Sequence, residues 1–255
     1  MMTNDLQDIA ATLDNAMFSA TATPQLGGTL SLDDAYAIQA MSFDRRLERG
    51  EVRVGMKMGF TSRAKMVQMG VDEMIWGRLT DKMLVEEGGS ISKADYVHPR
   101  CEPEIAFLLK KPLAGRVTAL QAQTAIEAIA PAIEVIDSRY ENFKFSLTDV
   151  VADNSSSSGV VIGAWNSVPD DISNLGMVLS QNGKAVEIGS SAAILGHPIR
   201  SLIAASRLVE ERGEVLEAGS IVLAGGATAA IALSAGDKVK LDVEQLGRVN
   251  FSVEP

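Results

Sequence analysis

The strongest local signal in this chain of 255 residues is a turn dipeptide between two alternating segments. In "MVLSQNGKAVEIG", the dipeptide Asn182-Gly183 separates two runs in which apolar and polar residues alternate. Asn-Gly readily adopts the positive φ angles that a two-residue hairpin turn requires. Further short strand-like segments follow over 220–226, 238–247 and 249–254. The second half of the chain is therefore predicted to be rich in strands.

The first 50 residues have a helical rather than an alternating pattern. Apolar residues recur at helical spacing in "DLQDIAATLDNAMF", and a second helix is expected between Ser31, a good N-cap, and Gly50. From residue 51 the pattern changes, and "VRVGMKMGF" alternates like a strand. We predict an α+β fold with a helical N-terminal segment over 1–50. A domain over 51–255 would form a mixed β-roll or barrel with surrounding helices.

The middle of the chain is predicted to mix both kinds of element. The segments expected there are a short helix within 62–79, a loop to Asp81, a strand over 104–110, a helix over 119–130 between Thr118 and Pro131, a strand over 132–139, and a helix from Pro198 to Gly213. The helix limits follow from the capping preference of threonine and from the inability of proline to continue a helix. Pro198 suits the first position of its helix.

Composition narrows the class of partner and the cellular location. The chain has 23 Lys and Arg against 33 Asp and Glu, so its net charge is −10, which argues against nucleic-acid binding. Cys101 is the single cysteine, so an internal disulfide is ruled out and a reducing compartment is suitable. No apolar run approaches the ~20 residues of a membrane span. The early acidic residues are unlike a signal peptide. We expect a cytoplasmic protein with no membrane and no nucleic-acid partner.

Three glutamates stand in strand-like apolar segments. Glu102 and Glu104 in "EPEIAFLL" lie two residues apart, so they would point to the same face of a strand. Pro103 between them places this segment at a strand start, an edge or a bulge. Glu134 in "PAIEVID" would face away from its apolar neighbours Ile133 and Val135. An exposed, solvated strand face would also account for each of these acids alone.

A divalent cation explains the three acids together. Buried carboxylates are costly unless a positive charge compensates them. Ligands that are all oxygen atoms favour Mg²⁺ or Mn²⁺, whereas zinc would be expected with a cluster of His or Cys, which this sequence lacks. The sequence therefore predicts a metal site at Glu102, Glu104 and Glu134.

Several longer segments match one enzyme family. They are "GMKMGFTSRAKMVQMGVDEMIWGRLTD", "HPRCEPEIAFLL", "PAIEVIDSRYENFKF", "VVADNSSSSG", "GHPIRSL" and "AGGATAA", and they extend from Gly55 to Ala230. Together they resemble the 2-keto-4-pentenoate hydratases and the 4-oxalocrotonate (2-oxo-3-hexenedioate) decarboxylases of aromatic meta-cleavage pathways. Both groups belong to the fumarylacetoacetate hydrolase superfamily, whose mixed β-roll agrees with the fold predicted above.

The resemblance implies roles for individual residues. It assigns the metal to Glu102, Glu104 and Glu134, and it places Lys57 and Asp81 in the active-site region. As catalytic residues, Lys57 is expected to stabilise the developing charge on the C2 oxygen, and Asp81 to move a proton or orient Lys57; a turn residue is the alternative for Asp81. Ser158 and Gly225 are the expected donors to the substrate. Arg139 is a candidate for binding a terminal carboxylate, and so is Arg63.

The resemblance also implies a reaction, with alternatives. The segments "EVIDSRYENFKF", "VADNSSS" and "GGATAA" are more similar to the decarboxylases. We therefore expect a metal-dependent lyase that converts 2-oxo-3-hexenedioate, a small 2-oxo diacid, to 2-hydroxypenta-2,4-dienoate and CO₂. A 2-keto-4-pentenoate hydratase is the first alternative, and a non-catalytic partner subunit of a related enzyme is the second. Homo-oligomerisation and a complex with the pathway hydratase are also expected.

Overall fold

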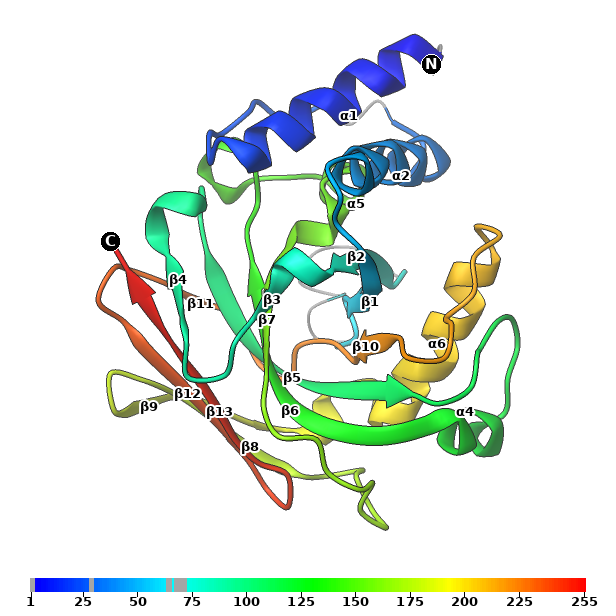
Figure 1. Ribbon diagram of the computed structural model, residues 1–255, viewed down its shortest axis with the longest axis vertical. Coiled ribbons are helices and arrows are strands. Elements are labelled where there is room, and N and C mark those ends of the chain that lie inside the picture. The colour runs from blue at the N-terminus through cyan, green and yellow to red at the C-terminus, as the bar shows by residue number, and fades with distance from the viewer. Residues whose placement is uncertain (1–2, 28–29, 63–65, 67–72) are drawn as a thin grey trace.

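The computed structural model describes residues 3–27, 30–62, 66 and 73–255. Figure 1 shows curved sheets with helices packed around them. This arrangement confirms the predicted α+β fold, with a curled mixed sheet and helices at the N-terminus. Within the described part of the chain, no helix is both long and apolar enough to cross a bilayer.

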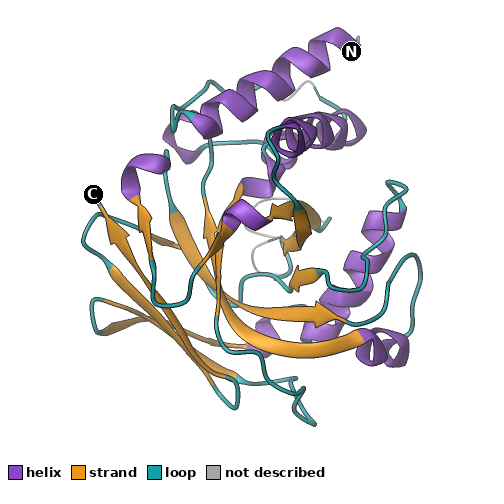
Figure 2. Ribbon diagram, viewed as in Figure 1, coloured by secondary structure: helices purple, strands orange, loops and turns teal. Residues whose placement is uncertain are grey.

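The helices lie at two sides of the sheets (Figure 2). They are α1 (Thr3–Phe18), α2 (Leu32–Glu48), α4 (Ala119–Ala125), α5 (Leu147–Ala152) and α6 (Pro198–Glu210). Ser31 caps α2 as predicted, in a reciprocal capping box with Asp34. The side-chain amide of Gln39 on α2 donates to the backbone oxygens of Trp76 and Val151, at 3.1 and 2.7 Å. Because α2 is tied in this way to later segments, a domain boundary at residue 50 stays a prediction.

The larger sheet is mixed and carries the candidate site. Its strands, in spatial order, are β2 (Ile75–Thr80), β1 (Arg53–Gly59), β10 (Ile221–Leu223), β5 (Arg100–Leu109), β6 (Ile126–Ile136), β7 (Ser157–Ile162) and β3 (Leu84–Val85), and β11 (Ile231–Ala232) also pairs with β5. The β1–β10 and β3–β7 pairs are parallel, and the other pairs in this sheet are antiparallel.

The smaller sheet packs against β6 and β7 and contains the predicted hairpin. Its strands, in spatial order, are β4 (Ser90–Ser92), β13 (Gly247–Glu254), β12 (Lys238–Val243), β8 (Gly176–Gln181) and β9 (Lys184–Ser190). Asn182 and Gly183 connect β8 to β9 with φ angles of 53° and 78°, which confirms the turn.

Two sequence predictions are wrong in the middle of the chain. The predicted loop before Asp81 is strand β2, which is buried along its whole length, so its residues show no alternation. The predicted helix over 119–130 ends at Ala125, and β6 runs on through Pro131. The backbone oxygen of Pro131 accepts from the N–H of Gly163 at 2.9 Å, so the side of Pro131 that lacks an N–H faces the end of β7. The short helix expected after Ser62 lies mostly outside the described residues.

Pro103 lies where β5 changes its neighbour. On one edge β5 pairs with β11 at residues 100–101 and with β10 at 106–108. Between them the oxygen of Pro103 accepts from the N–H of Ala227 at 2.9 Å, so the missing N–H faces this interval. The proline therefore removes no bond from the ladder with β6. β5 and β6 stay in register across the three glutamates.

Candidate metal centre

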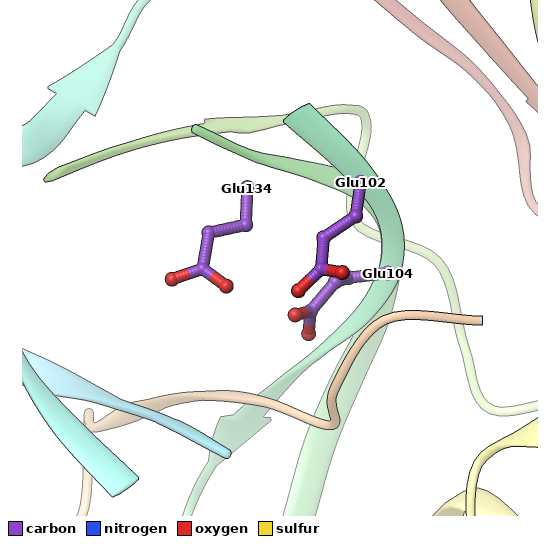
Figure 3. A group of neighbouring side chains, drawn as sticks. All are labelled: Glu102, Glu104 and Glu134. Atoms are coloured by element: carbon purple, nitrogen blue, oxygen red, sulfur yellow. The ribbon is translucent and has the colours of Figure 1, made fainter. Parts of the chain in front are cut away.

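The three predicted glutamates come together on adjacent strands. Glu102 on β5 lies directly opposite Glu134 on β6, and Glu104 lies two residues further along the same face of β5. One carboxylate oxygen from each lies within 4.8 Å of the others. Figure 3 shows the carboxylate groups converging on a common space. Antiparallel pairing in this register explains how two segments distant in sequence form one cluster.

Two of these acids each have one oxygen that no donor satisfies. Glu104 and Glu134 are fully buried, and Glu102 is 7% exposed. Glu104 Oε2 accepts from the backbone N–H of Gly225 at 2.6 Å, and Glu134 Oε2 accepts from Lys57 Nζ at 2.9 Å. The second oxygen of each, Oε1, is buried without a hydrogen-bond partner among the described residues. Such oxygens suit a hard cation, which needs ligands rather than hydrogen-bond donors.

Gly225 holds one of these carboxylates in place. Its φ of 107° favours glycine, and a Cβ atom there would lie 2.0 Å from Oγ1 of Thr61. Sequence analysis predicts Gly225 as a substrate-binding residue. In the structure its N–H is used by Glu104, so its direct contact is with a candidate metal ligand.

The cluster is short of positive charge. Burial raises the pKa of Glu104 well above its ordinary value, and the charges of Glu134 and Glu102 add to this shift. Burial also raises the pKa of Glu134, against the opposing effect of the Lys57 ammonium. Burial alone would lower the pKa of Lys57, but the three carboxylates outweigh burial and the pKa is raised. Lys57 therefore offsets the acids only in part, since the pKa values of Glu104 and Glu134 stay raised, and a divalent cation would stabilise their ionised forms.

A cavity of about 270 Å³ opens beside the acids. Its charged lining residues are Lys57, Arg100 and Glu102. The remaining lining residues are mainly apolar or small, namely Gly59, Phe60, Ile75, Ile136, Phe143, Phe145, Val150, Ser155, Ser156, Ala229 and Ala230. This volume suits a small molecule, with its polar contacts concentrated at the acidic end.

Strained backbone surrounds this cavity. Phe60, Phe143, Ser155 and Ser156 all line it, and all have positive φ angles, of 54°, 55°, 52° and 59°. Non-glycine residues adopt this region infrequently, and they do so most often at functional sites. The serines belong to the short helix η4 (Asn154–Ser156), which directly precedes β7. Ser156 Oγ is buried and has no hydrogen-bond partner among the described residues, so it is available to a ligand.

Comparisons with known proteins identify the family. The fumarylacetoacetate (FAA) hydrolase C-terminal family matches residues 58–254. The chain belongs to this family. It is 60% identical over 246 residues to a 4-oxalocrotonate decarboxylase of a Pseudomonas species, covering 96% of each chain. It is 33% identical over 254 residues to a 2-keto-4-pentenoate hydratase of Paraburkholderia xenovorans, covering 97% of this chain and 94% of the relative.

A solved structure within the FAA hydrolase family is similar over nearly the whole chain. It is the 4-oxalocrotonate decarboxylase from Pseudomonas putida G7, complexed with magnesium and adipate. The TM-score is 0.96 at 37% sequence identity, and the match covers 99% of this chain and 98% of that chain. The family relationship predicted from the sequence is therefore confirmed.

The substrate-binding roles predicted from the sequence for Ser158 and Arg139 stay predictions. Neither is among the described residues that line the cavity. Arg139 Nη1 donates to Ser158 Oγ at 2.6 Å, and the rest of the guanidinium is held by Asp153. The serine that reaches the cavity with a free hydroxyl is Ser156, two residues earlier. A run of serines gives no signal for which one faces inward, because this depends on the left-handed turn at Asn154–Ser156.

Asp81 also lies apart from Glu102, Glu104 and Glu134. Its Oδ1 accepts from the backbone N–H of Val52 at 2.8 Å, just before β1. Lys57 pairs with Gly77, and Asp81 lies four residues beyond Gly77 along the chain, about 13 Å at the rise of a strand. The structure therefore does not place Asp81 where it could orient Lys57, and its catalytic role stays a prediction.

The apolar wall of the cavity is formed mainly by aromatic residues. Ile75 on β2 also lines the cavity, whereas its neighbours Met74 and Trp76 are not among the described lining residues. Met69 and Arg63 lie outside the described residues. The larger apolar surfaces come from Phe60, Phe143 and Phe145.

Proposed function

We propose that this member of the FAA hydrolase family is a Mg²⁺- or Mn²⁺-dependent carboxy-lyase of aromatic meta-cleavage catabolism. It would decarboxylate 2-oxo-3-hexenedioate to 2-hydroxypenta-2,4-dienoate and CO₂. The observation that carries the proposal is the pair of buried, donor-free oxygens on Glu104 and Glu134, which face Glu102 beside a small-molecule cavity. The 60% identity to a 4-oxalocrotonate decarboxylase supports the choice of reaction.

Glu102, Glu104 and Glu134 would hold the cation. When bound, the ion acts as a Lewis acid toward the C1 carboxylate and C2 oxygen of a 2-oxo acid. The magnesium and adipate bound to the P. putida G7 relative support a divalent cation and a six-carbon diacid. Gly225 fixes Glu104 and Lys57 fixes Glu134, so two of the three ligands are oriented before the substrate arrives.

Lys57 is the residue best placed to assist the electron flow. Breaking the C5–C6 bond releases CO₂, and the bonding pair forms the C4=C5 double bond. The C3=C4 pair then moves to C2=C3, and the C2 oxygen gains negative charge and takes up a proton. The Lys57 ammonium lines the cavity and gives one hydrogen bond to Glu134. Its remaining N–H groups can stabilise that charge and deliver the proton.

Ser156 and the aromatic wall have complementary roles. The free Ser156 hydroxyl can donate to the C1 carboxylate, the function that sequence analysis expects of Ser158. The rings of Phe60, Phe143 and Phe145 give the cavity an apolar wall, which would disfavour bound water. Exclusion of water disfavours hydration of the diene, which is the reaction of the alternative hydratase.

The hydratase remains the alternative, because relatives with that name align over almost the whole chain. A single pair of assays separates the reactions. Purified protein with Mg²⁺ is given either 2-oxo-3-hexenedioate or 2-hydroxypenta-2,4-dienoate, and CO₂ release and diene hydration are measured. CO₂ release from the diacid, abolished by EDTA and restored by Mg²⁺, is the expected result. Turnover of the diene alone would overturn the proposal in favour of the hydratase.

A non-catalytic partner subunit is disfavoured by the same cluster. Two buried carboxylate oxygens without donors would destabilise a protein that never binds a cation. Binding of Mg²⁺ to the purified protein by titration calorimetry therefore tests this alternative, and no binding would favour it. Homo-oligomerisation, a complex with the pathway hydratase and a cytoplasmic location belong to this proposal. Light scattering of the protein, alone and mixed with the hydratase, tests the two assemblies.

A further inference from the structure

Arg100 brings a positive charge to the wall that carries the acids. It is the first residue of β5, and residues 100, 102 and 104 share one face of that strand. Its side chain lines the cavity together with Glu102. The Arg100 guanidinium carbon lies 4.2 Å from the centroid of the Phe143 ring, in a cation–π contact. Along β5 the described cavity lining is therefore acidic at Glu102 and basic at Arg100.

Arg100 lacks the ion pair that comparable arginines have. Among the described residues, every other arginine that is at least partly shielded from solvent pairs with a carboxylate. Those arginines are Arg45, Arg46, Arg53, Arg78, Arg139, Arg207 and Arg212. The Phe143 ring stabilises the Arg100 charge only in part, since a cation–π contact contributes about 0.5–2 kcal/mol. A half-buried guanidinium that faces a cavity and has no anionic partner within the described part of the chain indicates a place for an anion.

The spacing along β5 matches a six-carbon chain. Arg100 and Glu102 are two residues apart, which is about 7 Å along a strand. A six-carbon diacid has five carbon–carbon bonds of about 1.5 Å, so its ends lie about 6 Å apart when extended. A 2-oxo acid held at the glutamates can therefore place a second carboxylate near Arg100.

We propose that Arg100 binds the carboxylate furthest from the 2-oxo group, and so makes the enzyme selective for 2-oxo diacids over 2-oxo monoacids. This inference rests on the proposed function, because it assumes a 2-oxo acid anchored at Glu102, Glu104 and Glu134. It differs from the role expected of Arg139, whose guanidinium is already occupied by Asp153 and Ser158.

The contact favours binding rather than the chemical step. The far carboxylate leaves as neutral CO₂, so its ion pair with Arg100 weakens as the C5–C6 bond breaks. An interaction that is stronger in the ground state than in the transition state raises affinity without raising kcat. The Phe143 ring shares the guanidinium charge and so limits how tightly the departing group is held. The diene product has lost that carboxylate and leaves readily.

The test compares two unreactive ligands that differ in one carboxylate. Calorimetry in the presence of Mg²⁺ measures binding of 2-oxohexanedioate and 2-oxohexanoate to the wild type and to Arg100→Met and Arg100→Lys. The control is Lys110→Met, which removes a positive charge from an exposed side chain just beyond the other end of β5. We expect Arg100→Met to weaken diacid binding about 10- to 100-fold, as loss of a charged hydrogen bond does. Binding of the monoacid should change less than about threefold, and Arg100→Lys should keep part of the preference.

Each outcome has a defined meaning. Equal losses for both ligands, or an unchanged preference for the diacid in Arg100→Met, overturn the role of Arg100 while the proposed function stands. Retained monoacid binding shows that the variant is folded. With the reactive diacid, KM should rise by the same factor as the dissociation constant while kcat does not fall, because the lost contact is weaker in the transition state than in the ground state. If the wild type binds neither ligand with Mg²⁺ and releases no CO₂, the proposed function fails and this inference fails with it.

Discussion

Two buried clusters of charged residues lie close together in the fold, and they differ in the balance of positive and negative charge. In the cluster of Glu102, Glu104 and Glu134, Lys57 forms an ion pair with Glu134, and two oxygens of the cluster have no hydrogen-bond donor among the described residues. The second cluster, Arg139 with Asp153, contains one charge of each sign. Both clusters are almost completely buried, so burial alone does not distinguish them.

The balanced cluster uses all of its groups within the protein. Each guanidinium nitrogen of Arg139 donates to an oxygen, at 2.5 Å to Asp153 Oδ1, 2.6 Å to Ser158 Oγ and 2.5 Å to the Asp153 backbone. The other carboxylate oxygen of Asp153 accepts from the Arg139 N–H at 2.9 Å. These contacts fix the chain directly before Asn154–Ser156, whose serines line the cavity. Arg139 therefore acts through the backbone and leaves no group free for a substrate, whereas the unbalanced cluster leaves ligands for a cation.

The largest expected effect comes from neutralising the unbalanced cluster. Glu104→Gln should lower kcat by at least about 100-fold, because a Lewis-acid metal contributes several kcal/mol and each 1.4 kcal/mol is tenfold in rate. The metal-free variant should be no less stable than the metal-free wild type, since a neutral amide removes one buried negative charge. Activity with Mg²⁺ and urea denaturation without it measure the two effects.

The matched control for this variant is Glu127→Gln, which makes the same change at an exposed residue of β6. It should alter neither activity nor stability measurably. If Glu104→Gln kept full Mg²⁺-dependent activity, Glu104 would not be a metal ligand. The acidic cluster would then not differ from the Arg139–Asp153 pair by offering Glu104 to a cation.

Substitution in the balanced cluster, Arg139 with Asp153, should lower stability. Arg139→Met leaves Asp153 buried without its partner, and breaking a buried ion pair costs about 3–5 kcal/mol of unfolding free energy. The urea midpoint should fall accordingly. Lys240→Met breaks an exposed ion pair with Asp242 and should cost less than about 1 kcal/mol. A variant of Arg139 with normal stability and a raised KM would instead support the substrate contact that the sequence suggests.

The increase in Tm that Mg²⁺ causes should depend on pH, and this dependence should further distinguish the acidic cluster from the Arg139–Asp153 pair. Burial raises the folded-state pKa of Glu104 and of Glu134 above 4.5, so the metal-free protein gains stability from bound protons below pH 4.5. That stability is lost as the pH rises through the folded pKa values. Mg²⁺ takes the place of those protons and binds the ionised carboxylates. The increase in the Tm of the protein that Mg²⁺ causes should therefore grow with pH.

Thermal melts with and without Mg²⁺ at a series of pH values measure this growth. Burial raises the pKa of Asp153 to about 6 against the effect of Arg139, so Asp153 contributes its own pH dependence. That contribution is present in both melts and cancels in the difference. An increase in Tm that did not vary with pH would contradict the assignment of the protons to the acidic cluster.

The two clusters also differ in how far the sequence predicts them. The period of two in a strand places Glu102 and Glu104 on one face, and the apolar neighbours of Glu134 mark it as exceptional, so local pattern predicts the three candidate ligands. Their convergence comes from the β5–β6 register. The local sequence pattern does not predict that Ser156 is the serine that faces the cavity. Three consecutive non-glycine residues at 154–156 have φ angles of 51°, 52° and 59°, which no local preference predicts. Tertiary contacts hold that turn, since the Asn154 side chain exchanges two hydrogen bonds with the backbone of Arg78 and Ser155 Oγ donates to the Trp76 oxygen.

Asp81 is the remaining residue whose predicted role and observed position differ, and its substitution should have the smallest effect on activity. Its carboxylate joins the end of β2 to the start of β1 through the N–H of Val52, at 2.8 Å. Asp81→Ala should therefore cost about 1 kcal/mol, the net contribution of one such hydrogen bond. Because about 13 Å of strand separates it from Lys57, kcat should stay within about twofold of the wild type. Rates and urea midpoints measured on the same preparation separate the two effects. A large fall in kcat at normal stability would require Asp81 to approach the acidic cluster during turnover, and would restore the catalytic role implied by the family resemblance.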